Sequence, residues 1–131
     1  MIRISSSLDE RTEACLAEVV DSGIAVHREV GPGFTEPTYR NAMRVELIAR
    51  GIPFSCETTF TVPYRGQTVG VYRLDFVVRD CVVVELKAVK NLEPVHLAQV
   101  MAYLKASKLR AGLLMNFSGA TLKEGLKRIV L

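Results

Sequence analysis

Two stretches of the sequence, Arg73-Leu-Asp75-Phe-Val-Val78 and Val82-Val-Val-Glu85-Leu-Lys87-Ala88, place charged side chains inside otherwise apolar segments. Their valine, phenylalanine and leucine neighbours are typical of strands that are buried on both faces of a sheet. An unpaired charge buried in such a sheet is strongly destabilising. The sequence therefore predicts that Asp75, Glu85 and Lys87 serve a common purpose that offsets this cost.

The register between the two stretches decides whether the carboxylates meet. Side chains alternate between the faces of a strand, so a two-residue turn at Arg79-Asp80 would turn Asp75 and Glu85 to opposite faces. A three-residue loop over 79–81, or a bulge, would pair Asp75 with Glu85. Two paired carboxylates repel each other, and a hard divalent cation relieves that repulsion. A metal site therefore requires the second register.

Length and composition predict one domain over residues 1–131 with a single core, since 49% of the residues are hydrophobic. The net charge of +3 permits contact with a polyanion but does not require it. The three cysteines, Cys15, Cys56 and Cys81, are odd in number and far apart, so they indicate neither a disulfide framework nor a zinc site. No leader-like or membrane-spanning apolar run is present, which favours a cytoplasmic protein without membrane contact.

Hydrophobic periodicity and turn residues predict helices and strands in the order ααβββαβ. The helices are expected over about 8–30, 37–50 and 93–106. The strands are expected over 57–64, 67–78, 82–89 and 110–117. A helix connects the last two strands, so these are expected to be parallel, and the tail over 122–131 fits a short helix or an edge strand. The fold class is thus α/β (α+β), with helices flanking a mixed sheet.

Several motifs resemble those of a known family. The order Asp75, Glu85, Lys87 resembles the PD-(D/E)xK nuclease superfamily, and Gly33-Phe-Thr-Glu36-Pro-Thr-Tyr39 resembles the small bacterial GxxExxY proteins within it. The resemblance covers most of the chain, through Val26-His27-Arg-Glu-Val-Gly31-Pro, Gly51-Ile-Pro-Phe54, Val84-Glu85-Leu-Lys87-Ala and Pro94-Val-His96-Leu-Ala-Gln99 to Tyr103-Leu104.

This resemblance implies a restriction-endonuclease-like core and hydrolysis of phosphodiester bonds in nucleic acid, with DNA favoured as substrate. It also implies a Mg²⁺ or Mn²⁺ cofactor held by Asp75, Glu85 and the main-chain carbonyl of Leu86, with Glu36 as a further ligand. Lys87 would hold the attacking water or stabilise the charge that develops on the phosphate.

Each of these residues also has a structural interpretation. Lys87 and Glu85 are two apart on one strand face and could simply form a salt bridge. Glu36 lies at the start of a helix, where a carboxylate caps free backbone amides. Tyr39 lies on the same helix face as Glu36, where its hydroxyl could reach Glu36 or a phosphate while its ring is buried in the core.

The helix expected over 93–106 carries His96, Gln99 and Tyr103 on neighbouring positions of one face. The resemblance implies that Gln99 faces the site, and it makes Tyr103 and His96 candidates for supporting or substrate-contacting roles. His96 could donate a proton to the leaving oxygen, or it could stabilise the start of the helix. His27 is most simply a cation near the end of the first helix.

Two functional hypotheses follow. The first is a metal-dependent nuclease, in which basic residues border a substrate groove: Arg40, Arg44, Lys90, Lys105, Lys108 and Arg110. No aromatic stacking ladder is evident in the sequence. The second hypothesis is an inactive nucleic-acid-binding or protein-interaction module on the same fold. So short a chain is also expected to form a homodimer or to use a protein partner for target selection.

Overall fold

The computed structural model describes residues 8–131. The expectation that the chain has no leader-like apolar run also concerns residues 1–7, which lie outside the described residues. The described elements are α1 (Glu10–Val30), α2 (Glu36–Ala49), β1 (Phe54–Tyr64), β2 (Gln67–Val78), β3 (Val82–Lys87), α3 (Pro94–Ser107), β4 (Ala111–Asn116), a 3-10 turn η1 (Leu122–Gly125) and β5 (Leu126–Val130). Within residues 8–131, no helix is both long and apolar enough to cross a bilayer.

The first two helices lie within two residues of their predicted bounds. The side chain of Asp9 accepts a hydrogen bond from the Thr12 amide at 2.8 Å, and Gly31 ends α1 with a φ of 74°. The second helix begins one residue earlier than predicted, at Glu36, with Pro37 in its first turn. Its N-cap residue is Thr35, which makes no side-chain capping hydrogen bond.

The five strands form one mixed sheet in the order β1-β2-β3-β4-β5. The pair β3–β4 is parallel, as the intervening helix predicted, and the other three pairs are antiparallel. The tail, for which the sequence left two alternatives, contains both the 3-10 turn and an edge strand. The mixed sheet with flanking helices confirms the predicted fold class.

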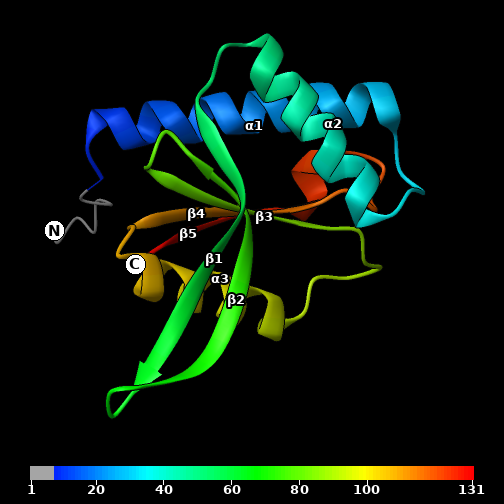
Figure 1. The fold of residues 1–131 in the computed structure, drawn as a ribbon. Coiled ribbons are helices and arrows are strands. Elements are labelled where there is room, and N and C mark those ends of the chain that lie inside the picture. The colour runs from blue at the N-terminus through cyan, green and yellow to red at the C-terminus, as the bar shows by residue number, and fades with distance from the viewer. Residues whose placement is uncertain (1–7) are drawn as a thin grey trace, which may run out of the picture.

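Helices cover both faces of the sheet, with α1 and α2 on one face and α3 on the other (Figure 1). The larger apolar cluster lies under α1 and α2 and includes Val19, Met43, Phe76 and Leu113. A second cluster lies under α3 and includes residues of β2, β3, β4 and β5, namely Leu74, Val83, Leu114 and Ile129. The central strands β3 and β4 are thus buried on both faces, as their continuous apolar runs predicted.

The hairpin β1–β2 extends well beyond the short strand β3. Its turn, Arg65-Gly66, has φ values of 50° and 80°, which are the two positive angles of a type I′ turn. The strand β2 pairs with β3 only at Phe76↔Val84, Val77↔Val83 and Val78↔Val82. Residues 67–75 of β2 are therefore not paired with β3. In Figure 1 the far part of this hairpin runs past α3.

The motif tyrosine, Tyr39, is fully buried and holds the connection between α1 and α2. Its hydroxyl donates to the carbonyl of Gly31 at 2.7 Å and accepts from the amide of Phe34 at 3.2 Å. Its ring stacks on Phe117, with the ring centroids 4.6 Å apart. Tyr39 therefore positions the start of α2, which carries Glu36 and Arg40.

Replacing Tyr39 with Phe should lower the free energy of unfolding by about 1–2 kcal/mol, because the Phe34 amide loses its acceptor and the Gly31 carbonyl loses its donor. Urea unfolding of the wild-type and variant proteins measures the difference. The matched control is Tyr64→Phe, at a tyrosine that is 64% exposed on the hairpin, and it should have little effect. Equal effects at the two positions would contradict the anchoring role of Tyr39.

Candidate active site

The candidate site lies where β2 and β3 separate. Beyond the last backbone pair, the amide of Asp75 donates to Oε1 of Glu85 at 2.9 Å, and the amide of Leu86 donates to Oδ2 of Asp75 at 2.8 Å. Each carboxylate thus accepts a hydrogen bond from a backbone amide of the other strand. The three-residue loop over 79–81 therefore sets the register, as the metal-site hypothesis required.

Both carboxyl groups are nearly excluded from water: Asp75 is 9% exposed and Glu85 is 6% exposed. Burial, followed by the charge of Asp75, raises the pKa of Glu85 to about 7. The backbone amide of Asp75 and the positive charge of Lys87 act in the opposite direction on this pKa. Two carboxyl groups are therefore held together at a net electrostatic cost, which a bound cation would relieve.

An arginine from α2 supplies the positive charge nearest to Asp75. The Nε atom of Arg40 donates to Oδ1 of Asp75 at 2.9 Å, and both side chains are largely buried. Sequence analysis placed Arg40 only among the basic residues bordering a groove. Its position one helical turn after Glu36 is the signal that would have brought it to the same site.

Lys87 lies at the end of β3, on the strand face that it shares with Glu85, and is partly buried. Within residues 8–131 no ion pair joins it to Glu85, so the simple salt-bridge interpretation is not what the structure shows. Its charge nevertheless lowers the pKa of Glu85, which places it in the electrostatic surroundings of that carboxyl group.

Glu36 lies in the first turn of α2 and is partly buried, and its charge contributes to raising the pKa of Glu85. In the described part of the chain its carboxylate makes no hydrogen bond that caps α2, but its charge suits the first turn of that helix. It also does not complete a set of three acidic, histidine or cysteine side chains able to hold a metal, because residues 8–131 contain no such set.

The three predicted residues of helix α3 have different surroundings in the structure. The hydroxyl of Tyr103 has its pKa raised to about 12, first by burial and then by the charges of Glu85 and Asp75. Gln99 lies one turn earlier and lines a surface groove together with Tyr103. The ring of His96 accepts from the amide of Glu93 through Nδ1 at 2.9 Å, in a capping box that stabilises the start of α3.

The remaining polar candidates hold parts of the structure together or lie away from the site. His27 is buried, its Nε2 is 2.9 Å from the carbonyl oxygen of Gly119, and its ring stacks on Phe117. It is therefore more than the C-terminal cation that the sequence suggested. Lys108 and Arg110 line a pocket at the amino end of β4, whereas Asn116 and the site lie toward the carboxyl end, so these two basic residues do not border the carboxylates.

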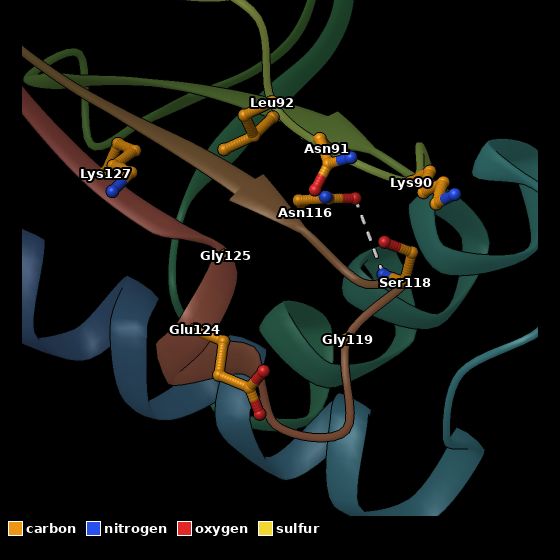
Figure 2. Close-up of a pocket in the computed structure, with 9 residues that line it drawn as sticks. All are labelled: Lys90, Asn91, Leu92, Asn116, Ser118, Gly119, Glu124, Gly125 and Lys127. Carbon is orange, nitrogen blue, oxygen red and sulfur yellow. Dashed lines mark hydrogen bonds between the residues drawn. The ribbon is translucent and has the colours of Figure 1, made fainter.

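A polar pocket of about 280 Å³ lies beside the carboxyl ends of β3 and β4 (Figure 2). In its wall, the side-chain amide of Asn116 accepts from the Val89 amide at 3.0 Å and donates to the Val89 carbonyl at 2.9 Å. This clamp fixes the segment that follows Lys87. Sequence analysis missed Asn116, although a polar residue that ends a six-residue buried strand was the available signal.

The donor set fits a hard divalent cation. One oxygen of each carboxylate accepts from a backbone amide, which leaves Oδ1 of Asp75 and the second oxygen of Glu85 without a backbone donor. Carboxylate oxygens are the ligands that Mg²⁺ and Mn²⁺ prefer, and Mg²⁺ usually takes only one or two of them from a protein. The contact between Arg40 and Oδ1 of Asp75 is the single obstacle, since a cation at that oxygen would have to displace the guanidinium.

A mixed sheet with two carboxylates and a lysine on neighbouring strands defines a nuclease-like domain. The model of the PD-(D/E)XK nuclease superfamily matches residues 13–129, and the chain belongs to this superfamily. Its members typically use divalent metal ions.

A solved structure described as "Crystal structure of SSO0001" has a similar fold, with a TM-score of 0.55 and 17% sequence identity. The match covers 92% of this chain and 59% of that one, so the chain spans about three fifths of the length of that protein. At this identity the likeness concerns the fold alone. No curated protein matches the chain.

The raised pKa of Glu85 predicts a pH-dependent loss of stability in the metal-free protein. The ordinary pKa of 4.5 applies in the unfolded chain, whereas the folded pKa is about 7. Between these values the unfolded chain releases the proton that the folded protein retains, so stability falls as pH rises and the loss is complete above pH 7.

The variant Glu85→Gln preserves an acceptor for the Asp75 amide but cannot ionise. Its stability relative to wild type should therefore increase from pH 4.5 to pH 7 and remain constant above that, as measured by urea unfolding in the presence of a chelator. Glu29→Gln, at an exposed position of α1, is the control and should parallel wild type. Parallel curves for Glu85→Gln and wild type would show that Glu85 has no raised pKa.

Proposed function

We propose that this chain is a Mg²⁺- or Mn²⁺-dependent nuclease that hydrolyses phosphodiester bonds, with DNA as the favoured substrate. The observation that supports this most strongly is the pair of buried carboxylates, Asp75 and Glu85, held together with Lys87 on the same strand face as Glu85. Membership of the GxxExxY proteins is part of the same proposal, and it is supported by the positions of Glu36 and Tyr39 on α2.

In this proposal Asp75 and Glu85 hold the cation through the oxygens that lack a backbone donor, with the main-chain carbonyl of Leu86 as a third ligand. The bound cation would activate water as a nucleophile and neutralise charge on the phosphate. The ammonium of Lys87 would orient the attacking water or stabilise the developing negative charge, which a compact point charge does well. Glu36 would contribute through an intervening water, because residues 8–131 contain no three acidic, histidine or cysteine side chains grouped so as to hold one metal ion.

Gln99 has a less direct part in the proposal. Its side chain is exposed and lines the groove beside Tyr103, so contact with the substrate suits it better than contact with the cation. Tyr103 would contact the substrate from the same helix. A phosphate could draw the guanidinium of Arg40 away from Asp75, since arginine binds phosphate well.

A second function is favoured by one observation, the ion pair between Arg40 and Asp75. This pair supplies a positive charge to the site without a metal, which is what an inactive nucleic-acid-binding or protein-interaction module would need for stability. Such a module would not require a divalent cation. The proposed cytoplasmic location and a homodimer or protein partner are compatible with either function.

Mn²⁺ titration and nucleic-acid cleavage together distinguish the two functions. Calorimetry should detect Mn²⁺ binding to wild type. The affinity for Mn²⁺ should be much lower in Asp75→Asn and Glu85→Gln, because both substitutions remove a negative charge while preserving the shape of the side chain. Cleavage of labelled single-stranded and duplex DNA and of RNA should fall at least about a hundredfold in these variants and in Lys87→Met.

The control is Glu29→Gln, which removes an exposed carboxylate remote from the site and should bind Mn²⁺ and cleave as wild type does. Thermal unfolding of every variant establishes that it is folded. Folded wild-type protein that neither binds Mn²⁺ at millimolar concentration nor cleaves any substrate would exclude the nuclease and favour the interaction module.

A further inference from the structure

A surface groove runs between the projecting hairpin and α3, beside the candidate active site. It measures about 440 Å³, which is within the range of about 300–1,000 Å³ typical of ligand pockets. Figure 1 shows the hairpin and α3 that form its two walls. Its lining is mostly apolar and contains no charged side chain: Phe60, Val62, Tyr72, Val95, Ala98, Gln99, Ala102 and Tyr103.

Three aromatic residues line this groove and contact one another. Phe60 and Tyr72 are partners on neighbouring strands and stack with centroids 5.6 Å apart and an interplanar angle of 23°. Phe60 also meets Tyr103 of α3 edge-on, with centroids 5.1 Å apart. These residues are distant in sequence, so the hairpin and helix assemble an aromatic cluster that no local motif indicates.

The ring of Tyr72 is both exposed and fixed in direction. The residue is 51% exposed, although its ring belongs to the aromatic cluster. Gly70 lies beneath this ring, because a Cβ atom added there would come within 2.8 Å of it. The glycine therefore leaves room for the tyrosine ring, which stacks on Phe60 while about half of the residue remains exposed.

Tyr103 connects the groove to the carboxylates. It packs in the same apolar cluster as Leu74, which precedes Asp75, and Leu114, which is the strand partner of Glu85. The charges of Glu85 and Asp75 also act on its hydroxyl. A polymer whose phosphate lies at the carboxylates would therefore place an adjoining unit at the groove.

The chemistry of the lining favours a flat, weakly polar occupant. Aromatic faces bind nucleobases by stacking, and the amide of Gln99 offers one donor and one acceptor group to the edge of a base. Alanines at 98 and 102 leave space above the helix surface. A base can enter such a groove only when it is unpaired, since base pairing and stacking keep it inside a duplex.

A second copy of the chain fits this groove less well. A standard interface uses about 20–30 residues on each side, whereas eight residues line the groove. The exposed valines of β2, Val69 and Val71, do not extend the groove. Side chains alternate along a strand, so these two valines point to the face opposite that of Tyr72.

We propose that this groove, the base groove, binds an unpaired nucleobase of a single-stranded substrate next to the nucleotide whose phosphate lies at Asp75 and Glu85. The inference rests on the proposed nuclease function for its choice of substrate. It adds a preference for single-stranded or locally opened nucleic acid, with Tyr72 providing the stacking face and Gln99 the polar contact.

Fluorescence anisotropy with a labelled single-stranded oligonucleotide in the presence of a chelator tests the base groove without any cleavage. The variant Tyr72→Leu should bind about tenfold more weakly than wild type, because it loses one base–aromatic contact. The matched control is Tyr64→Leu, which removes another exposed tyrosine of the same hairpin outside the groove and should bind as wild type does. For the duplex of the same sequence, Tyr72→Leu should change affinity much less.

Any of four outcomes would overturn the base groove. Two concern the single strand: wild type does not bind it, or the two tyrosine substitutions change its affinity equally. The other two concern Tyr72→Leu: it loses as much affinity for the duplex as for the single strand, or it alone has a lower molar mass in solution than wild type. The last outcome would make the groove a surface for self-association. Loss of single-strand binding in Tyr72→Leu with unchanged Mn²⁺ binding would separate this inference from the metal site. If wild type cleaves nucleic acid but Tyr72→Leu binds the single strand as wild type does, the nuclease proposal is retained and the base groove is excluded.

Discussion

The exchange of backbone amides and carboxylates between Asp75 and Glu85 is the interaction on which the rest of the site depends. It replaces the strand ladder at the point where β2 leaves β3, so the sheet can open there without leaving these two amides unpaired. The same divergence frees the long hairpin to reach α3, and the groove beside Tyr103 results from it. One local arrangement thus places the charges and shapes their surroundings.

This arrangement has an electrostatic cost that the fold offsets only in part. Burial and mutual repulsion raise the pKa of Glu85, while Arg40 from α2 pairs with Asp75. An arginine is a suitable temporary partner, because its guanidinium is always charged and also binds phosphate. Asp75 therefore has a positively charged partner without a metal, and a cation would have to displace Arg40 to use Oδ1 of Asp75. Neutralisation by Arg40 and binding of a divalent cation are competing ways to satisfy the same charge.

The apolar runs around Asp75 and Glu85 were sufficient to predict two neighbouring buried strands, and the helix after them predicted the parallel pair β3–β4. The loop length could not be chosen from sequence, since Arg79 and Asp80 both adopt positive φ values that ordinary residues rarely take. Arg40 and Asn116 were missed as site residues because their partners lie 35 and 27 residues away. The cluster of Phe60, Tyr72 and Tyr103 was missed because Tyr103 meets Phe60 only where α3 packs against the hairpin, although Phe60 and Tyr72 are strand partners.

A crystal structure of the protein soaked with Mn²⁺, recorded for anomalous scattering by manganese, tests the central claim most directly. The account predicts one strong anomalous peak in contact with Oδ1 of Asp75 and with the Glu85 oxygen that does not accept the Asp75 amide. It also predicts that the guanidinium of Arg40 has moved away from Asp75. No peak at this position under saturating Mn²⁺, with Arg40 still paired to Asp75, would contradict the claim that the two carboxylates form a metal site.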